Sequence, residues 1–168
     1  ERPEKGTGQD WYFMAYGHNY KSALKDFTVF AGKEPLPPRY AFGYWWSRFW
    51  AYSDDEIHDL VNNFHTYDIP LDVLVIDMDW HYTEHGKGGW TGYTWNRRLF
   101  PDPDGLLKYI KQNNLEVTLN LHPAEGIASY ETNFPAMAKW MGVNPDTTQV
   151  IPYEGSNKQF MSGWLNTL

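Results

Sequence analysis

The segment that decides the fold reads LDVLVIDMDWH and runs from Leu71 to His81. Its first part, Leu71–Met78, is an almost unbroken aliphatic run, which is typical of a strand buried on both faces of a parallel sheet. The run ends abruptly in acids and aromatic rings. Because the carboxyl ends of the strands face the ligand in parallel α/β folds, Asp77 and Asp79 are candidates for function.

Strand and helix alternate on both sides of this segment. A capping box at residues 53–56 predicts the start of a helix, and the spacing of apolar residues predicts three more. The further strands are expected over 40–46 and 116–121, and the further helices over 104–113, 134–141 and 160–168. The order β-α-β-α-β-α favours a parallel sheet with right-handed crossovers.

The sequence predicts that the first 37 residues of the chain form a separate domain. Trp11–Tyr16 is short, aromatic and apolar, which predicts a strand, and residues 20–31 have the spacing of a helix that Gly32 ends. Three prolines follow within Lys33–Arg39, too many for a helix or a central strand. The expected domains are residues 1–37 and residues 38–168.

Length and composition exclude several classes of protein. At 168 residues the chain is shorter than the roughly 250 of a complete (β/α)8 barrel. A formal charge of -7 without a basic cluster argues against a nucleic-acid partner, and no apolar run approaches the roughly 20 residues that span a membrane. The chain has no cysteine, which excludes disulfides and thiol chemistry, and no glycine-rich phosphate loop, so no cofactor is expected.

The aromatic content points to a surface that stacks on a ligand. Nine tryptophans are many for a chain of this size, because tryptophan is large, carries a polar N–H and is seldom fully buried. Trp90 and Trp95 lie in a segment of unusual length between a predicted strand and helix, residues 79–103. Their polar neighbours favour a binding role, and anchoring of the loop is the alternative.

Asp77 and Asp79 are two residues apart, so in an extended strand both side chains lie on the same side of the sheet. They do not suit the acid and nucleophile of a glycosidase, which must flank the scissile bond. Contact with a ligand is one interpretation. The structural alternative is that one aspartate caps the loop and the other pairs with an arginine such as Arg48.

A second motif in the same loop is His81-Tyr82-Thr83-Glu84-His85, which fits the H-x-x-E-H pattern of a group of zinc peptidases. That chemistry needs a helix, so that both histidines face one zinc ion. Three glycines follow within residues 86–89, which makes a helix unfavourable. Zinc binding is therefore the weaker interpretation of this segment, and no metal site is predicted.

Four groups of residues resemble one family in order and spacing. They are Pro35-Leu36-Pro37-Pro38 with Ala41-Phe42-Gly43-Tyr44 and Ser47-Arg48, Ile76-Asp77-Met78-Asp79-Trp80, Trp95-Asn96 with Phe100-Pro101-Asp102-Pro103, and Leu119-Asn120-Leu121-His122-Pro123. Together they resemble the glycoside hydrolase family 31 α-glucosidases over nearly the whole chain. The resemblance implies the end of an N-terminal β-sandwich, a connecting helix and the first three βα units of a (β/α)8 TIM barrel.

The same resemblance implies a retaining α-glycosidase acting on an oligosaccharide or another α-glucoside. In that family the aspartate nucleophile follows the fourth strand and the aspartate acid/base comes later, and neither stretch is present, so no catalytic residue is assigned and the fragment alone is expected to be inactive. The resemblance places Asp77 at hydroxyls of the −1 sugar, with Met78, Trp90, Trp95 and Asn120 as further contacts. Asn120 departs from the family, which usually has an apolar or aromatic residue there.

Two rival functions remain open at this point, a self-sufficient carbohydrate-binding module and the zinc peptidase. A partial barrel would leave its first and third strands as sheet edges, so we expect self-association through those edges or through the exposed aromatic faces. Residues 1–10 lack the apolar core of a signal peptide, so any export signal was removed or lies upstream. A periplasmic or secreted location would suit a bacterial glycan-degrading enzyme.

Overall fold

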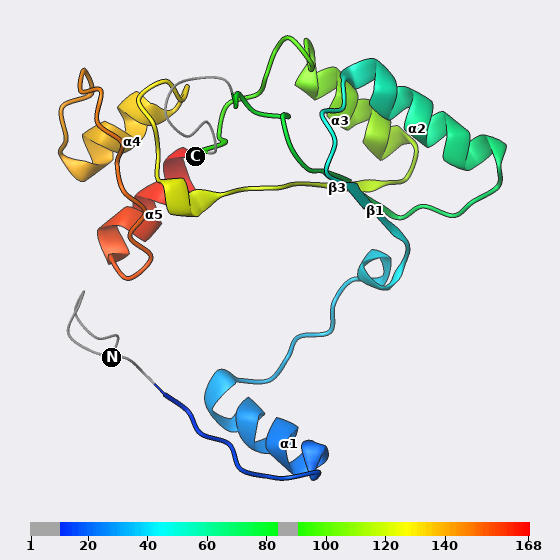
Figure 1. Cartoon of the computed structure of the whole chain (residues 1–168), viewed down its shortest axis with the longest axis vertical. Helices are drawn as coiled ribbons and strands as arrows, with labels where there is room; N and C mark the ends of the chain where they lie inside the picture. Colours follow the sequence, from blue (N-terminus) through cyan, green and yellow to red (C-terminus); the bar gives the residue numbers. More distant parts are fainter. Residues whose placement is uncertain (1–10, 84–90) are drawn as a thin grey trace. The chain divides into compact units, whose positions relative to one another are not determined.

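The computed structural model describes residues 11–83 and 91–168. The chain divides into two compact units, Glu1–Pro38 and Arg39–Leu168. The predicted site residues all lie in the second unit, whose elements are coloured from cyan to red in Figure 1. The assignment of residues 1–37 to a β-sandwich stays a prediction.

The first unit contains helix α1, Tyr20–Ala31, which confirms the predicted helix. Asn19 caps its first turn by accepting a hydrogen bond from the backbone N–H of Ser22, and Gly32 ends it with a φ of 88°. The predicted strand at Trp11–Tyr16 is wrong, because these residues are irregular. A strand needs a neighbour for its backbone hydrogen bonds, and none of the described residues supplies one.

The second unit is built on a parallel three-stranded sheet in the order β1-β2-β3, as predicted. The strands are β1 (Trp45–Arg48), β2 (Val73–Ile76) and β3 (Glu116–Leu119). Trp46 is in register with Leu74, which is in register with Val117. β2 lies between two neighbours, and three of its four side chains are buried, which explains its aliphatic sequence.

The start of β1 and the end of β2 both differ from the prediction. The residues predicted to begin the first strand form a short 3-10 turn, Arg39–Phe42, closed by a hydrogen bond from the N–H of Gly43 to the carbonyl of Tyr40. The second strand, β2, stops at Ile76 instead of Met78, and Asp79 has a positive φ of 60°. A strand does not extend through that conformation, so Asp79 marks the point beyond which the chain cannot be a strand.

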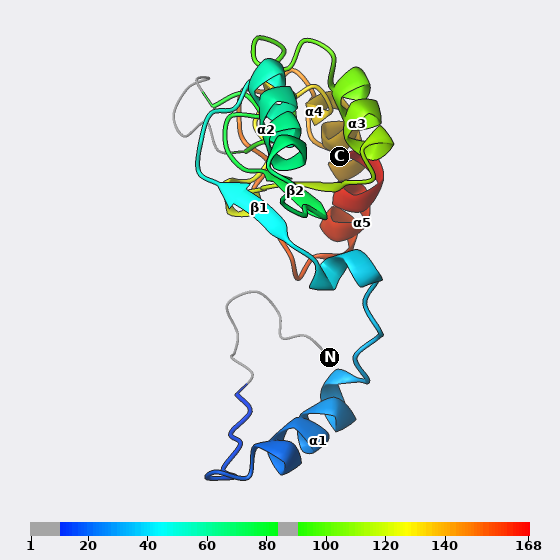
Figure 2. The same ribbon diagram turned by 90° about the vertical axis from the view of Figure 1, so that its right-hand side faces the viewer.

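Helices α2 (Asp54–Thr66) and α3 (Pro103–Gln112) lie side by side on one face of the sheet (Figures 1 and 2). The predicted capping box is present, since Ser53 accepts from the N–H of Glu56 and the Glu56 carboxylate accepts from the N–H of Ser53. Helix α3 begins at Pro103, one residue before the predicted range of 104–113, and is capped by Asp102, because proline suits the first helical position.

The largest core of the described residues lies between these two helices and the sheet. It is formed by apolar side chains from β2, from the inner stripes of α2 and α3, and from the loops around them. Its fully buried members include Ile57, Leu74, Ile76, Phe100 and Ile110. Burying an aliphatic or aromatic side chain of this size stabilises a fold by roughly 1.5–3 kcal/mol, so this core holds the helices on the sheet.

A second core joins helices α4 (Phe134–Met141) and α5 (Lys158–Thr167). Gly142 ends α4 in the left-handed conformation, with a φ of 69°, which glycine adopts without strain. The two helices approach closely at Gly163, where a Cβ atom would lie 2.5 Å from Cδ1 of Trp140. A backbone bridge between Ile127 and Ile151 ties the connecting segments to the same core.

All three strands run in the same direction, so their carboxyl ends lie together along one side of the sheet, called its carboxyl edge below. This carboxyl edge is distinct from the outer edges of the sheet, which are the unpaired sides of β1 and β3. Two long connections leave from the carboxyl edge. They are residues 77–102, between β2 and α3, and residues 120–133, between β3 and α4. None of the described helices is both long and apolar enough to cross a membrane.

Candidate functional site

Asp77 and Asn120 come together at the carboxyl edge of the sheet. Each follows its strand directly, and the last residues of those strands, Ile76 and Leu119, are in register. The side-chain amide of Asn120 donates a hydrogen bond to a carboxylate oxygen of Asp77. The N–H of Asn120 also donates to the carbonyl of Ile76, at 3.1 Å. The pair is therefore held by the backbone of two adjacent strands.

Trp80 fixes this pair from the side, and the sequence did not single it out for this role. Its ring is 4% exposed, and its Nε1 donates to the carbonyl of Asn120 at 2.8 Å. Met78 is also buried, at 4% exposed, so its predicted contact with a sugar stays a prediction. Trp80 therefore holds the backbone of Asn120 in place.

The side chain of Asp79 forms its hydrogen bond outside the Asp77–Asn120 pair. Because the chain turns there with a positive φ, the expectation that Asp77 and Asp79 share one side of an extended strand is wrong. The carboxylate of Asp79 accepts a hydrogen bond from the hydroxyl of Thr83 at 2.7 Å, within the same loop. The guanidinium of Arg48, which the structural alternative paired with one aspartate, lies over the ring of Trp50, 4.3 Å from its centroid.

Trp95 anchors the loop, which was the structural alternative. Its ring packs edge-on against Trp80 and Phe100, with centroid separations of 5.1 and 5.5 Å. Trp95 also lines a cleft of about 350 Å³ between the two long connections, and its contact with a ligand stays a prediction. Trp90, the other predicted aromatic contact, lies outside the described residues, and so do Glu84 and His85 of the H-x-x-E-H motif.

Glu131 joins the two long connections, and no sequence pattern pointed to it. Its side chain is 2% exposed. Its carboxylate accepts hydrogen bonds from the hydroxyls of Thr91 and Thr94 and from the N–H of Tyr93. A buried carboxylate with three donors is well satisfied, so it holds residues 91–94 against the loop that follows β3.

His81 is completely buried beside this network. Its Nδ1 lies 3.2 Å from the carbonyl of Tyr82, and Gly92 packs against the ring, where a Cβ atom would lie 2.8 Å from Nε2. Burial lowers the pKa of His81 below its ordinary value of 6.5, and the nearby carboxylates of Glu131 and Asp79 act in the opposite direction without outweighing it. Among residues 11–83 and 91–168, no three metal-binding side chains gather at one point.

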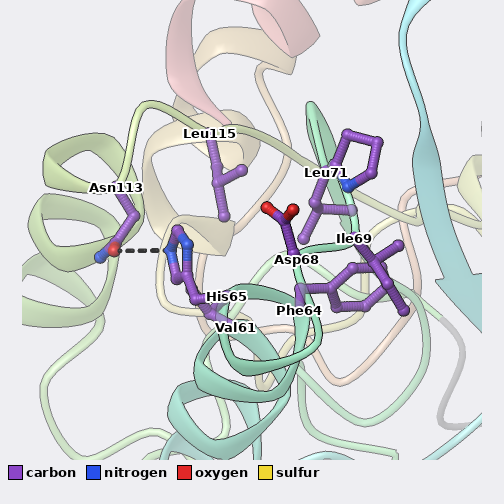
Figure 3. Close-up of a pocket in the computed structure, with 9 residues that line it drawn as sticks. Val61, Phe64, His65, Asp68, Ile69, Leu71, Asn113 and Leu115 are labelled. Atoms are coloured by element: carbon purple, nitrogen blue, oxygen red, sulfur yellow. Dashed lines mark hydrogen bonds between the residues drawn. The ribbon is translucent and has the colours of Figure 1, made fainter.

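Another pocket, of about 290 Å³, lies at the opposite end of the sheet (Figure 3). Its walls come from the end of α2 and from the residues just before β2 and β3, such as Ile69, Leu71 and Leu115. His65 and Asn113 join across it with a hydrogen bond of 3.2 Å. Because ligands of parallel α/β folds bind where strands end, the opposite edge, with Asp77 and Asn120, is the candidate site.

Three parallel strands joined by crossover helices form part of an α/β barrel, a class of fold in which ligands bind at the carboxyl ends of the strands. A family model described as "Glycosyl hydrolases family 31 TIM-barrel domain" matches residues 34–165. The chain therefore belongs to glycoside hydrolase family 31, as its motifs predicted.

Similar proteins support this membership. The chain is 33% identical to an α-xylosidase of Saccharolobus solfataricus over 68% of its own length, and 32% identical to α-glucosidase 2 of Bacillus thermoamyloliquefaciens over 96%. It covers only 15% and 17% of those two proteins. A xylosidase from Aspergillus niger has the same fold, with a TM-score of 0.64 and 21% identity over 85% of the chain and 20% of the solved protein.

The contacts of Glu131 predict a large effect of removing its carboxylate. In Glu131→Ala, three donors lose their acceptor, and each unsatisfied buried group costs about 1–3 kcal/mol. We expect the free energy of unfolding in urea to fall by about 3 kcal/mol or more, with faster proteolysis within residues 91–95. Glu125→Ala is the matched control, since Glu125 is exposed in the same connection. Equal losses in the two variants would contradict the assigned role.

The buried His81 predicts a loss of stability on mild acidification. Below about pH 6.5 the unfolded chain takes up a proton at this ring, whereas the folded chain resists it, so unfolding becomes easier as the pH falls. The contribution of this group declines by at most about 1.4 kcal/mol per pH unit. Denaturation between about pH 7.5 and 5.5 should give a shallower decline in His81→Gln than in the original chain. An equal slope in the two proteins would contradict this prediction.

Proposed function

We propose that the chain is the first part of the catalytic barrel of a retaining α-glycosidase that hydrolyses O-glycosyl bonds of α-linked glucosides. In this proposal it carries part of the −1 sugar subsite and neither the nucleophile nor the acid/base. The observation that carries the proposal is the Asp77–Asn120 pair at two adjacent strand ends. The names of the relatives, α-xylosidases and α-glucosidases, support the substrate class.

The geometry of the pair suits a sugar hydroxyl. Asn120 occupies one oxygen of the Asp77 carboxylate, which fixes the direction of the other oxygen. A carboxylate can accept about four hydrogen bonds, so capacity remains for hydroxyls of a bound sugar. Such charge-assisted bonds are about twice as strong as neutral ones. Because Trp80 holds the backbone of Asn120, the acceptor is positioned before the ligand arrives.

The same contacts argue against catalysis by these acids alone. Asp77 and Asp79 leave one strand end, and Asp79 is bonded to Thr83. A retaining glycosidase needs two carboxyl groups about 5–5.5 Å apart on opposite sides of the scissile bond. The proposal therefore assigns the catalytic pair to residues of the whole enzyme that follow Leu168.

The test compares the chain with a longer polypeptide that continues past Leu168. The chain alone should not hydrolyse p-nitrophenyl α-glucoside or α-xyloside, and the longer enzyme should hydrolyse at least one of them. In the longer enzyme, Asp77→Ala should lower kcat/KM by about 100-fold or more, because a bound hydroxyl loses a charged acceptor. Asp79→Ala is the matched control, with a smaller expected loss. Turnover by the chain alone that survives Asp77→Ala would refute the proposal.

The proposal also includes self-association of the isolated chain through its sheet edges. The outer strands β1 and β3 each have one edge without a partner strand among the described residues, and Trp45 on β1 is 44% exposed. We expect light scattering to give a mass above that of one chain, falling towards one chain in Trp45→Lys, because a charge on an edge opposes pairing. Leu36→Lys, at a residue 92% exposed outside the sheet, serves as control. A single-chain mass for the original protein would contradict this prediction.

A further inference from the structure

Two stretches of the connection between β2 and α3 pair with each other through the backbone. The N–H of Asn96 donates to the carbonyl of Trp80 at 2.7 Å. One residue further along, His81 forms an antiparallel bridge with Trp95. Residues 91–96, called the 91–96 segment below, are therefore held by the residues that follow β2.

The ring of His81 is the buried part of this contact. Its side chain is completely buried, and the backbone of Gly92 packs directly on it. A Cβ atom on Gly92 would lie 2.8 Å from both Cδ2 and Nε2 of the ring. The φ of Gly92 is 64°, a left-handed conformation that glycine adopts without strain. The 91–96 segment thus lies against the Nε2 side of the imidazole, with no space for a side chain between them.

The hydrogen bond of the other ring nitrogen shows where the neutral ring carries its hydrogen. Nδ1 is 3.2 Å from the carbonyl oxygen of Tyr82, which can only accept, so the hydrogen lies on Nδ1. Nε2 is then the atom that gains a proton when the ring becomes charged. It is buried and has no hydrogen-bond partner among the described residues. A new N–H at that position would lack an acceptor, which destabilises the closed arrangement.

Several titratable side chains face the ring and bear on its charge. Among the described residues they are Glu131 and His122 from the connection after β3, and Asp79 from the connection that contains His81. Burial opposes the charged ring most strongly and His122 adds to this, whereas the Tyr82 carbonyl and the two carboxylates favour it. Because burial outweighs them, the pKa of His81 lies below its ordinary value of 6.5 while the segment is in place. Release of the segment exposes the ring to water and removes this penalty.

We propose that His81 is a pH switch: protonation of its Nε2 below about pH 6.5 releases the 91–96 segment from the residues that follow β2. The sheet and its helices stay folded, because their core is formed by other residues, such as Leu74 and Ile110. Glu131 keeps its hydrogen bonds to the segment, so the segment shifts without leaving the connection after β3.

Release of the segment changes the support of the candidate site. Trp95 belongs to the segment, and its ring packs edge-on against Trp80, with centroids 5.1 Å apart. Trp80 in turn donates to the carbonyl of Asn120. Mild acid therefore loosens one side of the indole that fixes the Asp77–Asn120 pair. This regulation of sugar binding rests on the proposed function, whereas the release of the segment does not.

The test is amide hydrogen exchange of the 15N-labelled chain at about pH 7.5 and about pH 5.5, expressed as protection factors that correct for the intrinsic pH dependence of exchange. The N–H of Asn96, which bonds to Trp80, reports release of the segment. Its protection factor should fall about tenfold at the lower pH, because a proton taken up only on opening favours opening by up to about tenfold per pH unit. In His81→Gln, which cannot take up the proton, this fall should be absent.

Two controls locate the effect. Thr83→Val changes the same connection and leaves the imidazole in place, so it should keep the fall at Asn96. Low urea distinguishes release of the segment from unfolding of the chain, since unfolding exposes far more surface and responds more strongly to urea. Exchange at Asn96 at the lower pH should therefore be the same with and without about 1 M urea. An equal fall in His81→Gln, or exchange at Asn96 that urea accelerates, would overturn the proposal.

A second measurement needs no variant. In the chain labelled with 15N at histidine, long-range 1H–15N spectra at about pH 7.5 should show the His81 ring with its hydrogen on Nδ1 and none on Nε2. A hydrogen on Nε2 would overturn the proposal, because that atom would then have no proton to gain. Neither measurement involves a sugar or turnover, so an inactive longer enzyme would count only against the proposed function. A segment that stays in place at the lower pH would count only against the switch.

Discussion

The burial of β2 between two parallel neighbours is the constraint on which the rest of the second unit depends. Leu74 and Ile76 are completely buried, and the backbone of β2 is paired on both sides. Parallel strands need a crossover connection, so each neighbour must be joined through a helix that covers the sheet. Helices α2 and α3 meet that need, and the same geometry brings the three carboxyl ends to one edge.

The alignment of the strand ends explains why polar side chains lie together at the carboxyl edge. Ile76 and Leu119, the last residues of β2 and β3, are in register, so the residues that follow them, Asp77 and Asn120, come into contact. No local sequence pattern indicates this contact. The loops beyond them are long, and they are held by buried contacts: Trp80 and Trp95 pack into the main core, and Glu131 joins one loop to the other. A rigid edge of this kind suits the positioning of a sugar, which gains affinity from groups fixed in advance.

Local signals predicted the helices well, because a helix satisfies its hydrogen bonds within one segment. The capping box at Ser53 and the glycine stop at Gly32 both function as predicted. Strand limits were less predictable, since a strand depends on its partner. Trp11–Tyr16 has the composition of a strand and forms none, and residues 40–42 form a turn ahead of β1.

The sequence by itself determined the family, the parallel α/β class and the position of Asp77 at the end of a buried strand, because these follow from local composition and motif order. Tertiary structure alone decided which side chains meet. Asn120 reaches Asp77 across 43 positions, and Glu131 reaches Thr91 across 40. It also decided that Asp79 bonds to Thr83, and that Trp95 packs against Trp80 while lining a cleft. Such contacts depend on strand register and loop packing, which join residues far apart in the chain and leave no periodic trace in it.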